Sequence, residues 1–155
     1  MDMRVTPRQK MKLVMVGNGM AGVRALEELL KLAPDLYDIT VFGAEPHPNY
    51  NRILLSPVLA GEQTVDEIVL NDWTWYQENS ITLHAGFKVT QVDRVRRIVI
   101  GTNPEGQVVQ APYDRLILAT GSNPIILPLP GRDLAGVLAY RDIADTQAMI
   151  EAAAQ

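Results

Sequence analysis

The sequence predicts an α/β fold, in which helices cover a parallel sheet and a three-stranded antiparallel meander is inserted. Residues 12–16 are mostly apolar, as in a strand that is buried on both faces, and residues 21–32 show apolar positions at helical spacing. A further apolar run at residues 38–42 completes a strand–helix–strand unit, whose strands should be parallel. Three later strands are joined by short connections, which implies antiparallel pairing. These meander strands are expected at residues 87–95, 97–101 and 107–111.

A glycine motif joins the first strand to the first helix. It reads Gly17-Asn18-Gly19-Met20-Ala21-Gly22, which is the G-x-G-x-x-G pattern of Rossmann-like dinucleotide-binding folds. Gly17 permits the tight turn, Gly19 lets the backbone approach a pyrophosphate, and Gly22 lets the helix pack closely on the strand. The N–H groups and the dipole of the helix would then favour a bound phosphate. A tight structural turn is the alternative, and the motif alone does not separate FAD from NAD.

Two charged residues follow the second strand. Glu45 lies just past the end of that strand, where a carboxylate can accept hydrogen bonds from ribose hydroxyls. Its separation from Gly17 exceeds the usual spacing of about 20 residues, and the loop at residues 32–37 absorbs the difference. Arg52 lies in a proline-rich loop, and its guanidinium suits phosphates and flat rings. The alternatives are an exposed surface acid for Glu45 and a surface salt bridge for Arg52.

The remaining segments predict further short elements. Ser56 and Pro57 should begin a helix that stops at Gly61, with the serine as its N-cap. A central strand at residues 116–119 ends in Ala119-Thr120-Gly121, whose small side chains would let a ligand approach the backbone. The other expected elements are a helix at residues 72–79, a strand at 81–84, a surface loop at 122–136 and a helix at 141–154.

The aromatic and histidine residues are assigned to packing rather than to chemistry. Trp73, Trp75 and Tyr76 fit core and rim positions better than a cofactor cage. His84 has no nucleophile or acid as an obvious partner, so we expect a structural role, and His47 is expected to be an ordinary loop residue. No residue has the setting of a nucleophile or general base, so no catalytic residue is expected in this sequence.

Composition restricts the function classes. The 155 residues are 47% hydrophobic and 21% charged, which is typical of one globular domain. A net charge of −4 argues against a nucleic-acid or anionic membrane partner. The absence of cysteine excludes thiol catalysis and thiolate ligation of metals or clusters within this sequence. Residues 1–10 are expected to be a loose leader without a signal-peptide core, and no apolar run reaches the roughly 20 residues of a spanning helix, so a cytoplasmic location is expected.

Four segments together resemble the FAD half of two-dinucleotide flavoprotein reductases of the pyridine nucleotide-disulfide oxidoreductase type. The resemblance is most specific to the N-terminal region of the large subunit of bacterial NAD(P)H-dependent nitrite reductases, and it covers residues 11–155. The matching stretches are Val14 to Gly22, Ile39 to Phe42 with Glu45-Pro46, Tyr50 to Ser56, and Leu116 to Ser122. The stretch from Tyr50 to Ser56, together with Gly17-Asn18-Gly19-Met20, narrows the resemblance from the wider superfamily to this family.

The resemblance implies a role for each matched residue. Gly17 to Ala21 would hold the FAD pyrophosphate, and Glu45 the adenosine ribose. Arg52 would contact the phosphate or adenine side, and Ser56 would lie toward the flavin. The set is completed by Val89, which would offer its backbone to the adenine, and by Ala119, Thr120 and Gly121, which would pass close to the cofactor.

Two positions depart from the pattern of relatives. Ala44 stands where relatives often carry a first acidic residue, so Glu45 would act alone or the ribose contact would be weaker. Pro57 stands where ferredoxin-reductase relatives have a lysine beside the flavin, which speaks against close kinship with those reductases.

The resemblance implies an enzyme that passes electrons from NAD(P)H through FAD toward iron–sulfur and siroheme centres, where nitrite is reduced to ammonia. Relatives continue with a nicotinamide-binding domain and then with cluster-binding cysteines. We therefore expect residues 11–155 to be an FAD-binding domain truncated before the nicotinamide-binding domain, inactive alone and binding FAD weakly or substoichiometrically. Its partners would be small-molecule substrates, downstream domains of the same chain and a small subunit.

Two other functions stay open at this point. One is an FAD-dependent NAD(P)H reductase of rubredoxin, ferredoxin or another acceptor, and the other is a non-enzymatic nucleotide-binding module.

Overall fold

A four-stranded parallel sheet forms the centre of the computed structural model, which describes residues 9–154. Its strands are β1 (Met11–Val16), β2 (Tyr37–Gly43), β5 (Ile81–Ala85) and β9 (Arg115–Leu118), in the order β5-β2-β1-β9. The strand–helix–strand unit expected at the start of the chain is therefore confirmed, as are the two later strands of the sheet. Of the leader expected at residues 1–10, residues 1–8 lie outside the part that the structure describes.

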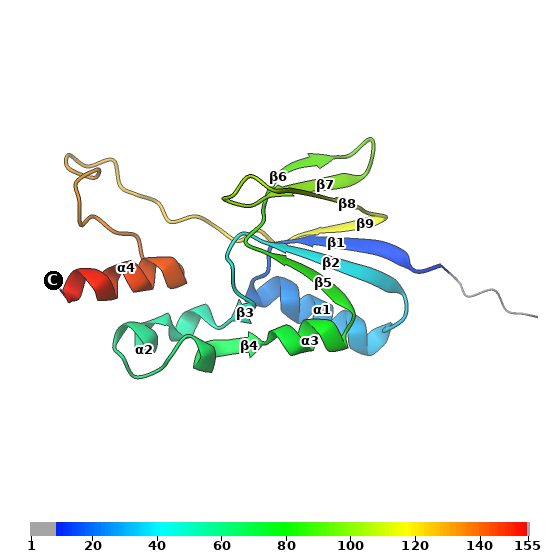
Figure 1. Cartoon of the computed structure of the whole chain (residues 1–155), viewed down its shortest axis with the longest axis horizontal. Coiled ribbons are helices and arrows are strands. Elements are labelled where there is room, and N and C mark those ends of the chain that lie inside the picture. The colour runs from blue at the N-terminus through cyan, green and yellow to red at the C-terminus, as the bar shows by residue number, and fades with distance from the viewer. Residues whose placement is uncertain (1–8, 155) are drawn as a thin grey trace, which may run out of the picture.

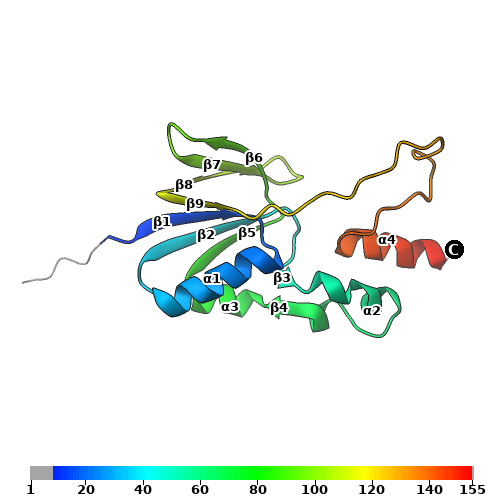
Figure 2. The same ribbon diagram turned by 180° about the vertical axis from the view of Figure 1, so that it is seen from behind.

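Two helices cover one face of this sheet. They are α1 (Met20–Leu32) and α3 (Trp73–Glu78), which lie on the same side in both views (Figures 1 and 2). The first core forms here and contains Leu13, Met15, Val23, Leu26, Ile39, Val41, Tyr76 and Ile81.

The antiparallel meander covers the opposite face. It consists of β6 (Lys88–Asp93), β7 (Ile98–Thr102) and β8 (Val108–Pro112), each slightly offset from its expected bounds (Figure 1). The second core lies between meander and sheet and contains Val14, Val16, Phe42, Val99 and Ala111. Alternate residues of β1 thus enter opposite cores, which explains why the strand is apolar along its length.

A third packing unit lies beside the sheet. It holds β3 (Asn49–Tyr50), the 3-10 turn η1 (Arg52–Leu54), α2 (Leu55–Leu59), the 3-10 turn η2 (Asp66–Ile68) and β4 (Val69–Asn71). The strands β3 and β4 pair antiparallel and were not anticipated, because two or three residues are too few to show a period of two. Its core contains Tyr50, Leu55, Val58, Ile68 and Ile143.

The helix expected to start at Ser56 begins one residue earlier. Leu54 is its N-cap and Ser56 lies within its first turn, so the expected serine cap is wrong. The reason is that η1 runs directly into α2 and already orients the backbone. The Ser56 hydroxyl instead lies 3.0 Å from the Tyr140 hydroxyl.

The last helix, α4 (Ile143–Ala153), begins two residues later than expected. Asp142 is the N-cap, and its side chain accepts from the Asp145 backbone N–H at 2.9 Å in a capping box. An exposed segment without helix or strand leads from β9 to this helix, which lies beside α2 rather than on the sheet (Figures 1 and 2). Within residues 9–154, no helix combines the length and the apolar character needed to cross a membrane.

Candidate functional site

The glycine turn after β1 is shaped by the end of β9. Gly17 has a φ of +106°, and a Cβ there would lie 2.0 Å from the Ala119 carbonyl oxygen. A side chain is therefore excluded both by conformation and by space. A Cβ on Gly22 would lie 2.9 Å from both the Ala119 Cβ and the Met15 Sδ, so this glycine permits the close packing of α1 on the sheet.

Gly19 differs from the other two glycines because the place of its side chain is open. A Cβ there would have no heavy atom within 4 Å, although Gly19 is the N-cap of α1. The first helical hydrogen bond runs from the Val23 N–H to the Gly19 carbonyl at 3.0 Å, so the N–H groups of Met20, Ala21 and Gly22 have no acceptor within the helix. The first turn of α1 has no acidic side chain. This arrangement suits an anion.

Asn18, at the second position of the motif, turns its side chain toward the loop after β2. Its Oδ1 accepts from the Tyr76 hydroxyl at 2.7 Å, and its Nδ2 donates to the His47 carbonyl at 3.3 Å. The side chain thereby joins the glycine turn to the loop that carries Glu45.

Glu45 belongs to a compact polar cluster with Tyr50 and Arg52. The Tyr50 hydroxyl donates to Glu45 Oε2 at 2.6 Å, and Arg52 Nη2 forms an ion pair with Glu45 Oε1. The Arg52 guanidinium also lies 5.1 Å from the Tyr50 ring centroid, within cation–π range. Burial first, and then the bond to Glu45, raise the pKa of Tyr50, so its phenol stays a protonated donor.

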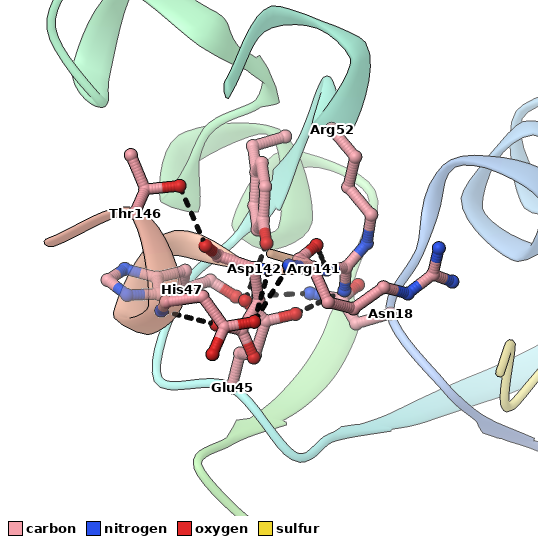
Figure 3. Close-up of polar contacts among 9 residues, drawn as sticks. Asn18, Glu45, His47, Arg52, Arg141, Asp142 and Thr146 are labelled. Carbon is pink, nitrogen blue, oxygen red and sulfur yellow. Dashed lines mark hydrogen bonds and ion pairs between the residues drawn. The ribbon is translucent and has the colours of Figure 1, made fainter. Parts of the chain in front are cut away.

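The ion pair changes how the two charged residues are interpreted. The salt bridge that was the alternative for Arg52 is present, and its partner is Glu45 itself (Figure 3). Both side chains are partly exposed, Arg52 at 29% and Glu45 at 25%. A ribose bound by Glu45 would have to share the carboxylate with Arg52 and Tyr50.

The small residues Ala119, Thr120 and Gly121 follow β9, and Ala119 lies directly against the glycine turn. The Ala119 N–H donates to the Val16 carbonyl at 2.8 Å, and Thr120 follows it on the exposed surface. Gly121 has a φ of +70°, and a Cβ there would lie 3.7 Å from Arg141 Nη2. The structure therefore brings Arg141 to this edge, next to residues expected at the site.

Arg141 is a residue that sequence reasoning missed. Its carbonyl accepts from Arg52 Nη1 at 3.1 Å (Figure 3). Its side chain lies beside Gly121. No local signal identifies it, because it lies in a segment distant from every motif. The Asp142 cap fixes its position, since the Arg141 N–H donates to Asp145 Oδ2 at 2.7 Å within the same helix start.

Two expected site residues lie on other elements. Ser56 is exposed on α2, bonded to Tyr140. Val89 lies on β6, where it pairs with Gly101 beside a bulge in the register, and its side chain packs against the second core. A bulge leaves ladder groups without their usual partner, which is compatible with the backbone role expected of Val89.

The aromatic residues are used mainly for packing, as expected. Tyr76 is buried, with its ring 5.0 Å from that of Trp75 in an edge-to-face contact, and Trp75 packs against the first core. Trp73 is 49% exposed and lines a hollow of about 850 Å³ beside the loop at residues 46–48. Neither the glycine turn nor Glu45 lines this hollow. His84 packs against Phe42 and Phe87, with ring centroids 5.0 and 5.7 Å away.

Comparison with known proteins identifies the family of the chain. The family model for pyridine nucleotide-disulphide oxidoreductases matches residues 11–155. The chain is 57% identical to a nitrite reductase [NAD(P)H] of Bacillus subtilis (strain 168) over 94% of its length, and 50% identical to an assimilatory nitrate reductase electron transfer subunit of the same organism over 94%. It spans 18% of the length of each of these relatives.

The fold also matches solved structures. The water-forming NADH oxidase from Lactobacillus brevis superposes with a TM-score of 0.82 over 94% of this chain and 33% of that one, at 24% identity. That likeness supports the α/β fold with its inserted meander. Because the family model covers almost the whole described chain, the protein belongs to the pyridine nucleotide-disulphide oxidoreductase family.

Proposed function

We propose that this chain is the FAD-binding part of an NAD(P)H-dependent nitrite reductase. The observation that carries the proposal is the glycine turn, in which the Ala119 carbonyl occupies the place of a side chain at Gly17 while the place of a side chain at Gly19 is empty. The chain that contains this turn is 57% identical to a nitrite reductase. In a whole protein of this kind, nitrite would be reduced to ammonia at the expense of NAD(P)H.

The residues of the turn fit the pyrophosphate of FAD. Gly19 leaves space beside the backbone, and the N–H groups of Met20, Ala21 and Gly22 offer donors without competing acidic groups. Arg141 adds a positive charge at the opposite edge, beside Gly121. Binding of a dianionic pyrophosphate is favoured by this charge and by the dipole of α1.

Other residues would hold the adenosine half. Glu45 offers carboxylate oxygens to ribose hydroxyls, and the backbone of Val89 would meet the adenine. Arg52 and Tyr50 orient Glu45, because Arg52 pairs with one carboxylate oxygen while the Tyr50 hydroxyl donates to the other. Ser56 would lie toward the flavin. A bound FAD would supply the exchange of electrons with NAD(P)H, and the residues of this chain would bind and orient it.

We further propose that residues 11–155 are the FAD-binding domain of a longer protein. The relatives are more than five times as long as the matched region, which supports a nicotinamide-binding domain and redox centres outside this sequence. The cysteines that bind an iron–sulfur cluster and siroheme would also have to lie outside this sequence, because it contains no cysteine. A separate small subunit and the downstream domains are the proposed partners.

The test is ligand binding to the purified chain. We expect FAD to bind weakly or substoichiometrically, with quenching of flavin fluorescence, and ADP to compete with it, because ADP carries the pyrophosphate and ribose. Gly19→Ala should weaken FAD binding by roughly tenfold or more, because its methyl group occupies the phosphate space, while the fold stays intact.

A control variant and two contrary outcomes complete the test. Gly106→Ala, in a turn remote from the site, should leave FAD binding unchanged. A chain that binds neither FAD nor ADP would contradict the proposal, and vigorous NADH-driven nitrite reduction by this chain alone would contradict its assignment as one part of a relay.

A further inference from the structure

A buried tyrosine hydroxyl lies between the glycine turn and the loop that carries Glu45. Tyr76, on α3, is 2% exposed. Its hydroxyl donates to Asn18 Oδ1 at 2.7 Å and accepts from the Asn49 backbone N–H at 3.3 Å. Asn18 belongs to the turn and Asn49 to β3, so one oxygen atom joins two segments that are distant in the sequence.

The Asn18 side chain is held on its other sides as well. Its Nδ2 donates to the His47 carbonyl at 3.3 Å (Figure 3), and a Cβ on Gly43 would lie 2.9 Å from the Asn18 Cβ. Gly43 ends β2, so the turn and the strand end touch directly. Because the Tyr76 hydroxyl is buried, its pKa is raised and it stays a donor to Asn18.

A second polar chain ties the same loop to the middle of α1. Asn49 Nδ2 donates to Asn71 Oδ1 at 2.8 Å, and Asn71 Nδ2 donates to Glu27 Oε1 at 2.9 Å. Asn49 and Asn71 are 2% and 4% exposed. The loop is therefore fixed to α1 at Glu27 as well as to the phosphate end of the helix through Tyr76.

We propose that Tyr76 is a positioning residue, which sets the separation between the phosphate-binding turn and the ribose-binding Glu45 through Asn18 and Asn49. The inference rests on the proposed function. A ligand that spans both subsites benefits from a fixed separation, because no binding free energy is lost in ordering the two segments. A ligand that occupies one subsite gains nothing from it. Tyr76 therefore affects ADP and FAD but not adenosine.

The decisive variant is Tyr76→Phe, which keeps the buried ring and removes only the hydroxyl. We expect the Kd for ADP and FAD to rise roughly 2- to 10-fold, because the variant loses the hydrogen bonds to both segments, while the Kd for adenosine stays unchanged. Hydrogen exchange at the Asn49 N–H should become faster, because that group loses its acceptor. The matched control is Trp75→Phe, on the same helix and in the same aromatic contact, which should leave the ratio of ADP to adenosine affinity unchanged.

Each outcome is informative. If Tyr76→Phe changes ADP and adenosine affinity equally, or neither, the positioning role is wrong while the proposed function stands. If the unaltered chain binds neither FAD nor ADP, both proposals fail together. If Tyr76→Phe does not fold, Asn18→Ala removes the acceptor of the same hydrogen bond. An unchanged ratio of ADP to adenosine affinity in that variant would overturn the inference.

Discussion

Gly17 and Gly19 belong to one turn but have opposite surroundings. At Gly17 the protein leaves no room, since the Ala119 carbonyl occupies the place of a side chain. At Gly19 no heavy atom lies within 4 Å of the place of a Cβ. The first glycine is therefore required by the fold, and the proposed function gives the open space at the second to the pyrophosphate.

Gly17→Ala should lower the free energy of unfolding by about 3 kcal/mol or more, because a Cβ combines left-handed strain with overlap of the Ala119 carbonyl. Gly106→Ala is the control, since Gly106 has a φ of +83° but open space around it, and it should cost only about 1 kcal/mol. Urea denaturation measures both. Equal losses would show that space at Gly17 is unimportant.

Arg141→Gln should raise the Kd for FAD several-fold at low salt, because it removes the positive charge beside Gly121. The difference between the variant and the unaltered chain should shrink as salt screens that charge. Arg132→Gln is the control, because Arg132 is an exposed arginine in the same connecting segment and pairs with Asp133. Titration with FAD at two ionic strengths measures the effect, and equal behaviour of the two variants would refute a role for Arg141.

At the scale of elements, the long periodic segments were predictable and the short ones were not. The helix α1 and the strands β1 and β2 each bury a face or both faces, so their apolar pattern is regular. The strands β3 and β4 have two and three residues, and their pairing comes from the third core around Tyr50 and Ile68. The start of α2 was misplaced because η1 precedes it directly.

The strand β5 carries a pH-dependent contribution to stability through His84. Burial against Phe42 and Phe87 lowers its pKa below the ordinary 6.5, so the unfolded chain takes up this proton at a higher pH than the folded chain. The contribution is constant above about pH 6.5 and is lost as the pH falls from there toward the folded pKa.

His84→Phe should remove this dependence while keeping the aromatic contacts. We expect the loss of unfolding free energy between pH 7.5 and pH 5.5 to be smaller in the variant than in the unaltered chain. Urea denaturation at both pH values gives the comparison. An identical loss in the two proteins would show that the histidine is not the group responsible.

At the scale of the whole molecule, the chain packs around three cores, and one exposed connection joins β9 to α4. The first two cores share the central sheet, and the third holds α4 through Ile143. The helix α4 lies apart from the sheet (Figure 2). Between β9 and α4, residues 120–138 are all exposed and form no helix or strand. The position of Arg141 beside Gly121 therefore depends on the packing of α4 against α2 rather than on the sheet.

Limited trypsin digestion should cut first after Arg132, in the exposed connection. Arg94 and Arg96 are also exposed, but their turn is tight and is held by Asp93 Oδ1, which accepts from the Val95 and Arg96 N–H groups at 3.0 and 2.9 Å. Mass spectrometry identifies the first fragments, and Arg132→Gln should delay the cut. Initial cleavage in the Asp93 turn would contradict this view of the molecule.

The sequence by itself determined the features that depend on neighbours along the chain. These are the apolar strand β1, the amphipathic helix α1, the glycine turn between them and the meander with its short turns. Each follows from a local period or from a backbone conformation that few residues adopt.

Only the tertiary structure decided which distant groups meet at the turn. Ala119 closes Gly17, Arg52 pairs with Glu45, Tyr76 holds Asn18, and Arg141 reaches Gly121. The physical reason is that these contacts join residues from separate elements, so the packing of the three cores sets their geometry. Such contacts produce no periodic pattern in the sequence from which they could be predicted.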